Sequence, residues 1–231
     1  MKIEDYGITG NCRSSALVSK YGSIDWCCLP DFDSPSIFAR LMDDEKGGYF
    51  GFSLKGDYSA SQAYINNTNI LKTTFISPEA SFEVIDFMPI YRTDEQNYYN
   101  APEIYRIFRI RKGKPVIRIE YFPKLNYARQ TKGFVDNGFI KHTTTEGRYE
   151  SVYLYSDLPY ELILSSDFFT LENDCFFCVT YNQKLVKTNF NRAYLEYQRT
   201  KVYWMNWSNR TPTFNLYHKE ILRSALLLKL L

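Results

Sequence analysis

The chain has 231 residues, of which 45% are hydrophobic and 23% are charged, and its formal net charge is +2. These proportions are typical of a folded globular domain. The small net charge argues against a strongly basic surface of the kind that binds nucleic acid or an anionic membrane. The N-terminus has no basic stretch followed by an apolar core, and no apolar run is long enough to span a bilayer. The five cysteines show no disulfide spacing, so we expect a cytoplasmic protein with reduced thiols.

Aromatic residues make up 17% of the chain, and such residues favour the pleated surface of a β-sheet. From residue 16 to about residue 181, short apolar segments alternate with turn residues, without an intervening helical pattern. The main expected strands are residues 16–18, 24–29, 49–54, 70–76, 81–87, 149–155, 160–164 and 176–181. Many short strands at this spacing predict a mainly β fold, a large antiparallel β-sandwich.

Two local patterns support this fold. Residues 117–121 alternate apolar and charged side chains, which is typical of a strand with one face in water. Asn137-Gly138 lies between apolar pairs at 134–135 and 139–140, and Asn-Gly favours a two-residue hairpin turn.

The pattern changes to helical spacing near the C-terminus. Phe190, Tyr194, Tyr197 and Trp204 form one aromatic stripe on an otherwise polar segment, which predicts an amphipathic helix over residues 188–210. We expect this stripe to pack on the sandwich or on a neighbouring domain.

The final segment, residues 211–231, predicts a second helix. Thr211-Pro212 has the pattern of an N-cap followed by proline in the first turn, and residues 221–231 are apolar on nearly every side. The sequence stops inside this apolar helix, so we expect a truncated chain whose parent continues past Leu231. Such a helix needs a partner, and self-association through it is therefore expected.

The acidic residues do not form a recognisable catalytic pair. An inverting glycosidase needs an acid and a base whose carboxyl groups are roughly 6.5–9.5 Å apart. Asp31 and Asp33 lie in a loop with two prolines, where aspartate is usually a turn former. The acidic run at residues 43–45 is typical of a solvated surface.

The cysteines and histidines also lack a site pattern. Cys175 and Cys178 have the spacing of half a zinc or redox site, but on a strand they face opposite sides of the sheet. Cys27-Cys28 faces two ways for the same reason. His142 and His218 are far apart in sequence and accompany no nucleophile motif. We therefore expect buried thiols, no metal, no cofactor and no catalytic residue.

The chain resembles the N-terminal part of bacterial glucoamylase- and trehalase-type enzymes of glycoside hydrolase family 15. Near the start, Gly22-Ser23-Ile24-Asp25-Trp26 is followed by the segment from Leu29 to Leu41. The resemblance extends in family order over nearly the whole chain, in residues 3–18, 22–26, 29–41, 44–48, 56–59, 64–65, 68–75, 82–89, 102–104, 125–128 and 220–231.

The resemblance implies a domain organisation: a β-sandwich domain at residues 1–187, a linker helix at 188–210, and the first helix of a catalytic (α/α)6 barrel at 211–231. In that family both catalytic glutamates lie on barrel loops, which would follow Leu231. The parent enzyme is then expected to hydrolyse an α-glucosidic bond of an oligosaccharide or of trehalose with inversion, without an obligatory cofactor. This chain alone is expected to be inactive, bracing the barrel.

The resemblance also implies a place for the loop at residues 29–38, at the domain face turned toward the barrel. Phe32 and Asp33 are expected at the rim of the substrate pocket. Family members more often have a basic residue where this chain has Asp31. The alternative is a purely structural turn, locked by the flanking prolines and by hydrogen bonds of the Asp33 side chain.

Two other functions remain open on the sequence. A carbohydrate-binding module would need a coplanar strip of exposed aromatic rings on one sheet face. A self-association domain without enzymatic role would need a partner for the apolar residues 221–231.

Overall fold

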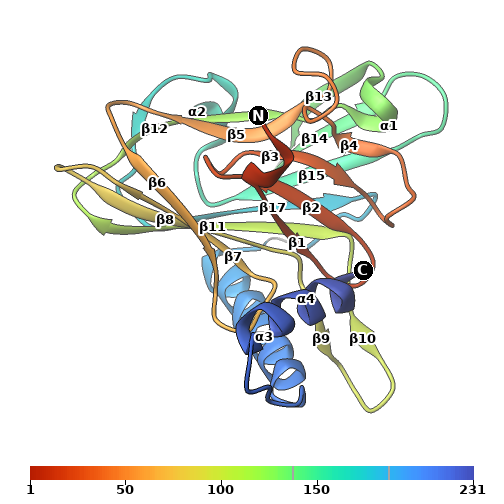
Figure 1. The fold of residues 1–231 in the computed structure, drawn as a ribbon. Helices are drawn as coiled ribbons and strands as arrows, with labels where there is room; N and C mark the ends of the chain where they lie inside the picture. Colours follow the sequence, from red (N-terminus) through yellow and green to blue (C-terminus); the bar gives the residue numbers. More distant parts are fainter. Residues whose placement is uncertain (137, 187) are drawn as a thin grey trace.

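The computed structural model describes residues 1–136, 138–186 and 188–231. Two antiparallel sheets pack face to face, and two helices near the C-terminus lie against one of them (Figure 1). The prediction of a mainly β, sandwich-like fold is confirmed.

The first sheet has seven strands, five of which come from the first 54 residues. In sheet order its strands are β1 (Tyr6–Gly10), β2 (Ser15–Ser19), β3 (Ile24–Cys28), β5 (Tyr49–Leu54), β12 (Val116–Phe122) and β16 (Phe169–Thr170), with β4 (Ser36–Phe38) paired to β3. Hairpins connect β1, β2 and β3, so local alternation and turn residues account for this edge.

The second sheet has eight strands. In sheet order they are β13 (Thr131–Asp136), β14 (Phe139–Thr144), β15 (Ser151–Ser156), β17 (Cys175–Tyr181), β11 (Glu103–Lys112), β8 (Ser81–Phe87), β7 (Leu71–Ile76) and β6 (Ser59–Tyr64). A separate two-stranded hairpin is formed by β9 (Tyr91–Arg92) and β10 (Tyr98–Tyr99). This hairpin projects beyond the sandwich beside the helices (Figure 1).

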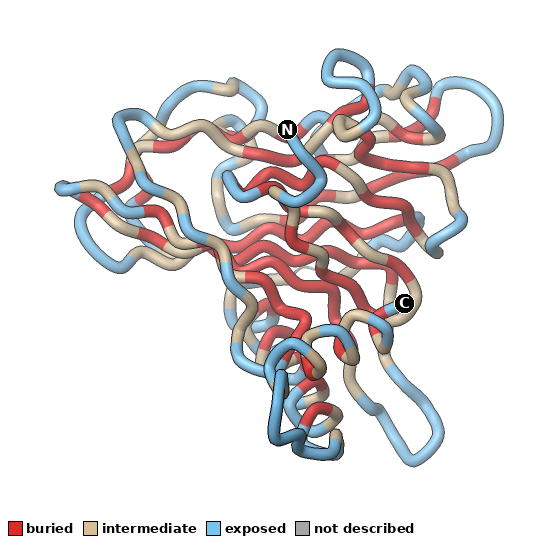
Figure 2. The backbone as a smooth tube through the Cα atoms, in the orientation of Figure 1, coloured by how far each residue is buried: buried red, intermediate tan, exposed pale blue. Residues whose placement is uncertain are grey.

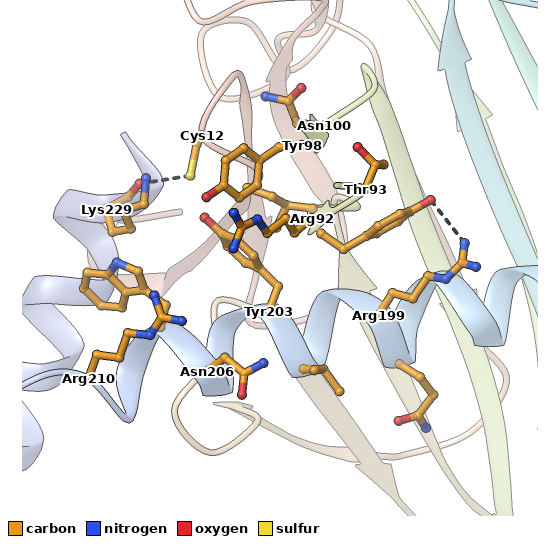
Figure 3. A pocket seen from close by; sticks show the side chains of 15 residues that line it. Cys12, Arg92, Thr93, Tyr98, Asn100, Arg199, Tyr203, Asn206, Arg210 and Lys229 are labelled. Atoms are coloured by element: carbon orange, nitrogen blue, oxygen red, sulfur yellow. Dashed lines mark hydrogen bonds between the residues drawn. The ribbon is translucent and has the colours of Figure 1, made fainter. Parts of the chain in front are cut away.

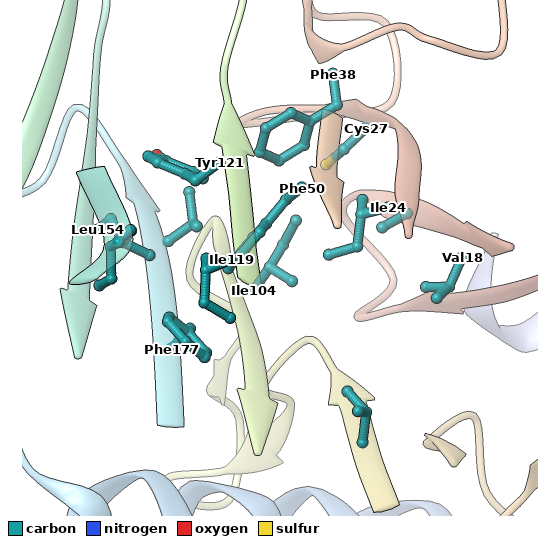
Figure 4. Packing of buried hydrophobic residues seen from close by; sticks show 14 of the residues in the cluster. Val18, Ile24, Cys27, Phe38, Phe50, Ile104, Ile119, Tyr121, Leu154 and Phe177 are labelled. Carbon is teal, nitrogen blue, oxygen red and sulfur yellow. The ribbon is translucent and has the colours of Figure 1, made fainter. Parts of the chain in front are cut away.

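The central strands of the eight-stranded sheet are buried on both faces, whereas the edge strands β13 and β6 are largely exposed. On β17, Cys175, Phe177 and Val179 belong to the core between the sheets, whereas Phe176 and Cys178 belong to a second cluster on the outer face. Figure 4 shows part of the inter-sheet core, and Figure 2 shows that the central strands are buried throughout. The two cysteines thus face opposite sides, as the strand pattern predicts.

Helix α3 (Phe190–Ser208) covers the outer face of this sheet. Asn189 caps it by accepting a hydrogen bond from the Arg192 N–H at 3.0 Å. Tyr197 and Trp204 are buried in the outer cluster, while Phe190 and Tyr194 are half-buried beside it. The predicted aromatic stripe therefore packs on the sandwich.

Helix α4 (His218–Leu230) packs on the same outer cluster through Leu222, Leu226 and Leu230. The Asn69 side-chain amide also donates to the Leu226 carbonyl at 2.8 Å. One side of this apolar helix is therefore covered within the chain, whereas Leu228 on another side is 74% exposed. No helix in the described part of the chain is both long and apolar enough to cross a membrane.

The predicted start of this last helix is wrong. The Thr211-Pro212 signal predicts an N-cap there, but α4 begins at His218 after Tyr217, which has a left-handed backbone with φ of 55°. A local capping pattern contributes about 1 kcal/mol. Burial of three leucines, each worth more, sets the helix further along the chain.

The predicted strand at residues 160–164 is also wrong, because this segment forms the short helix α2 (Tyr160–Leu164). It buries Ile163 and follows Pro159, whose φ of −56° suits the first turn of a helix. A short apolar run has no periodicity that distinguishes a strand from a helix. The other short helical elements are η1 (Ile3–Asp5) and α1 (Leu125–Ala128), the latter with left-handed dihedrals.

The predicted hairpin around Asn137-Gly138 has its two strands, β13 and β14, paired antiparallel with Asp136 opposite Phe139. Asn137 itself lies outside the described residues. The domain boundary predicted at residue 187 also lies outside them.

Candidate functional site

The residues predicted at the pocket rim lie in the loop between β3 and β4. Phe32 is 37% exposed, and Asp33 is exposed as well. The loop is closed by Ser34: its Oγ accepts from the Asp31 N–H at 3.1 Å, and its own N–H donates to the Asp31 carbonyl at 3.1 Å. The hydrogen bonds of Ser34 therefore hold this turn. The alternative of a purely structural turn predicted that the Asp33 side chain would make these bonds.

Asp31, the position where family members more often have a basic residue, forms an ion pair within the chain. Its Oδ1 lies 2.6 Å from Arg13 Nε, in the turn between β1 and β2. The pair fastens the loop to the neighbouring turn, where the Ser14 hydroxyl also donates to the Cys28 carbonyl. Asp31 therefore has a positioning role, and Phe32 and Asp33 remain exposed beside it.

The other acidic candidate, the run at residues 43–45, is a turn. Asp43 Oδ1 accepts from the backbone N–H groups of Glu45 at 3.0 Å and of Lys46 at 2.9 Å. These bonds hold the pKa of Asp43 below its ordinary value. A carboxylate held in this way caps a turn. Residues 43–45 are also exposed, as the interpretation of this run as a solvated surface predicts.

The two histidines lie in different parts of the fold. His142 is in β14, with its ring 5.4 Å from that of Tyr121, and burial lowers its pKa to about 4. His218 begins α4, where its Nδ1 accepts from the Phe214 N–H at 3.4 Å. Neither belongs to the cleft described next.

A cleft with a volume of about 1050 Å³ lies beside the two C-terminal helices. It lies between α3, the β9–β10 hairpin, the β1–β2 turn and the end of α4 (Figure 3). Four cationic side chains line it: Arg92, Arg199, Arg210 and Lys229. Because α3 and the hairpin are fixed on the sandwich independently, the cleft is a consequence of tertiary packing.

Aromatic rings form much of the wall. Tyr91 stacks on Tyr99 with ring centroids 4.9 Å apart, which orients the hairpin. Tyr98 meets Tyr203 of α3 edge to face at 6.0 Å and 83°. Trp207 of α3 also lines the cleft. Tyr98 and Tyr203 therefore stand at a steep angle and do not form a flat strip with each other.

The cations of the cleft are held in place by neighbouring groups. Arg92 Nε donates to the Asp94 carbonyl at 2.7 Å, within the hairpin. Arg199 Nη1 donates to the Tyr91 hydroxyl at 3.3 Å, which joins α3 to the hairpin.

Cys12 donates its S–H to the Lys229 carbonyl at 3.0 Å, and burial raises the pKa of the Cys12 thiol. A protonated thiol is a poor nucleophile.

No aspartate or glutamate belongs to the described residues that line this cleft. The cleft offers guanidinium groups, amides such as Asn100 and Asn206, and aromatic faces, which suit binding. It does not offer the acid and base of glycoside hydrolysis. Sequence reasoning missed the cleft because its residues come from four separated segments without a shared motif.

Known proteins resemble this chain over most of its length. Residues 1–146 match the family described as "Trehalase-like, N-terminal". The chain is 32% identical over 241 residues to a trehalase of Thermoplasma volcanium, covering 100% of this chain and 37% of that protein. It is 31% identical over 229 residues to a trehalase of Thermoplasma acidophilum, covering 93% of this chain and 38% of that protein.

A shorter match is closer in sequence: 43% identity over 84 residues to trehalase 1 of Sulfolobus acidocaldarius, covering 36% of this chain and 15% of that protein. The chain thus spans less than two fifths of the length of the Thermoplasma trehalases that it matches. From the family match over residues 1–146 and the agreement in extent with the Thermoplasma proteins, the chain belongs to the trehalase-like N-terminal domain family.

Proposed function

We propose that this chain is the non-catalytic N-terminal β-domain of a glycoside hydrolase of family 15. The observation that carries the proposal is the cleft of about 1050 Å³, which is lined by cations, amides and rings but has no carboxylate among its described lining residues. The catalytic (α/α)6 barrel, with its two glutamates, then corresponds to the part of the relatives that this chain does not match.

The parent enzyme, on this proposal, hydrolyses a terminal α-glucosidic bond in trehalose or in an oligosaccharide, with inversion. Support comes from the two Thermoplasma relatives, each of which is described as a trehalase. An inverting mechanism needs a general acid, a general base and a water between them. All three are assigned to the barrel, and this chain contributes shape and support.

The bracing role rests on α3 and α4. Their inner sides are fixed on the eight-stranded sheet, while their other sides carry exposed apolar residues such as Val202 at 54% and Leu228 at 74%. We assign this exposed side to contact with the barrel, with residues 188–210 as the linker and 211–231 as the first barrel helix. Phe32 and Asp33 are assigned to the rim of the substrate pocket.

The decisive experiment compares hydrolysis of trehalose by three samples. The first is this chain alone, the second is the Thermoplasma volcanium trehalase without its matched N-terminal part, and the third is a chimaera that joins the two. We expect no turnover by the first, little by the second and restored turnover by the third. Turnover of trehalose by this chain alone would overturn the proposal.

Self-association is a second proposal, favoured by the exposed apolar side of α4. Leu228 is 74% exposed and Leu231 is 63% exposed, and a second copy could cover both. Light scattering of the chain should then show a dimer or larger species that Leu228→Glu converts to a monomer. A carbohydrate-binding module has less support, because Tyr98 and Tyr203 meet at 83°.

A further inference from the structure

Two glutamates are buried where α3 packs on the outer face of the eight-stranded sheet. Glu103 begins β11 and Glu196 lies in the middle of α3, and both have an exposed fraction of 0%. Fully buried glutamates are rare unless a cation or a set of hydrogen bonds compensates each charge. The partners of the two carboxyl groups therefore indicate how each is ionised.

Both neighbouring arginines form ion pairs with Glu196. Its Oε1 lies 2.8 Å from Arg192 Nε and 3.5 Å from Arg199 Nη1. Glu103 has a different environment: its Oε1 accepts a hydrogen bond from the Tyr99 hydroxyl at 3.0 Å. Among the described residues, no cation forms an ion pair with Glu103.

The second carboxyl oxygen of Glu103 has no hydrogen-bond partner among the described residues, and the same holds for Glu196. A buried carboxylate without a cation is costly, because it loses its hydration and gains no charge partner. Burial raises the pKa of Glu103, which is the largest effect, and the Tyr99 and Tyr105 hydroxyls oppose this rise. The Glu196 carboxylate adds to the rise, and the Arg192 cation opposes it.

We propose that Glu103 is a neutral carboxylic acid in the folded chain, and that its deprotonation weakens the packing of α3 on the sheet. A neutral carboxyl group has no charge to desolvate, whereas an ionised Glu103 would be buried without an ion-pair partner. The ionised form would place a second negative charge beside Glu196 inside the same interface. Glu103 thereby makes the attachment of α3 dependent on pH.

Other titratable groups also face this cluster. On α3 these are Arg192, Glu196 and Arg199, and on the sheet and hairpin they are Tyr91 of β9, Tyr99 of β10, Tyr105 of β11 and Cys178 of β17. Burial raises the pKa of each of the three tyrosines and of Cys178. They stay protonated over the range in which Glu103 would ionise, so Glu103 is the responsive group.

The pH-dependent attachment of α3 also affects the cleft, because residues connected to this interface line it. The inference therefore goes beyond the proposed bracing role. Arg199 joins Glu196 to the Tyr91 hydroxyl, and both Arg199 and Tyr91 line the cleft. Loosening of α3 would therefore displace one wall of the cleft at higher pH. The direction follows from the raised pKa of Glu103. The stabilisation that its neutral form provides is complete below pH 4.5, its pKa in the unfolded chain, and is lost as the pH rises through its pKa in the folded chain.

The protonation state is measured directly by NMR of the chain labelled with ¹³C at glutamate carboxyl groups. We expect one glutamate signal to titrate above pH 4.5, the ordinary value for this side chain, and to be missing from the spectrum of Glu103→Gln. If every glutamate signal titrates near the ordinary value, the proposal is overturned. This titration needs only the natural chain and one assignment variant.

The consequence for α3 is measured by urea unfolding of the natural chain, of Glu103→Gln and of Glu79→Gln, where Glu79 is an exposed glutamate in the β7–β8 turn. As the pH rises above 4.5, the ordinary value for this side chain, the Glu103 contribution should lower the urea midpoint of the natural chain and of Glu79→Gln. Glu103→Gln should lose most of that fall, because glutamine is neutral at every pH. Parallel profiles for all three proteins would contradict the proposal. Should Glu103→Gln not fold, Glu103→Asp serves to assign the NMR signal, and the titration decides.

Discussion

Arg106 and Asp86 form a fully buried ion pair at the centre of the sandwich. Arg106 Nε lies 2.7 Å from Asp86 Oδ1, and both side chains are 0% exposed. The two residues are opposite each other on the neighbouring strands β11 and β8. The same guanidinium donates to the Phe50 carbonyl at 2.6 Å and to the Gly22 carbonyl, both in the opposite sheet region. Arg106 therefore connects the two layers.

Replacement of Arg106 by methionine should destabilise the chain strongly. The change leaves the Asp86 carboxylate buried without its cation and removes the donors of two buried carbonyl groups. Removing one partner of a buried pair typically costs about 3–5 kcal/mol of free energy of unfolding, measurable by urea denaturation. Lys114→Ala is the control, since its pair with Glu172 is exposed at 66% and 56% and should matter little. Equal effects of the two substitutions would contradict the assignment.

Leucines on two sides of α4 should respond differently to truncation. Leu226 is 2% exposed in the outer cluster, so Leu226→Ala should lower the free energy of unfolding by about 2–5 kcal/mol. Leu228→Ala on the same helix removes an exposed side chain and should have an effect within about 0.5 kcal/mol. Thermal unfolding of a monomeric sample measures both. A larger loss from Leu228→Ala would show that its side of α4 is covered in solution.

His142 should make the chain less stable as pH falls. Burial and the nearby Lys124 lower its pKa from 6.5 to about 4, so the unfolded chain binds a proton before the folded chain does. The corresponding stability is complete above pH 6.5 and declines as pH falls toward about 4. His142→Phe should flatten this part of the urea profile. An NMR titration of the natural His142 ring near its ordinary value would refute the prediction.

Phe32 and Asp33 should affect substrate binding by a complete enzyme without affecting folding. In the chimaera with the Thermoplasma volcanium trehalase, Asp33→Ala should raise KM for trehalose about fivefold, which corresponds to about 1 kcal/mol, with little change in kcat. Tyr21→Ala, a change of an exposed aromatic residue in the β2–β3 turn, is the control and should leave KM unchanged. An unchanged KM for both Phe32→Ala and Asp33→Ala would remove the loop from the pocket rim.

The fold class and the burial of particular side chains were predictable from the sequence. Alternation along residues 175–181 placed Cys175 and Cys178 on opposite faces, and a helical repeat placed Tyr197 and Trp204 on one side of α3. These patterns succeed because successive side chains alternate across a strand and every third or fourth residue shares a helix face. Such information lies within a few residues.

The exceptions were segments in which local signals are weak. Residues 160–164 are too short for a period to show, and the capping pattern at Thr211 was outweighed by the burial of Leu222, Leu226 and Leu230. Tertiary packing decides such cases because the free energy of burying several apolar side chains exceeds that of one cap.

The sequence by itself determined the periodicities, and with them the sandwich, the amphipathic α3 and the family resemblance. Only the tertiary structure decided which distant groups meet: Arg106 with the carbonyl of Phe50, Glu103 beside Glu196, and the β9–β10 hairpin against α3 around the cleft. Backbone periodicity is a local property of the chain. Pairing of buried charges and formation of a cleft depend on segments that come together only when both faces of the eight-stranded sheet are covered.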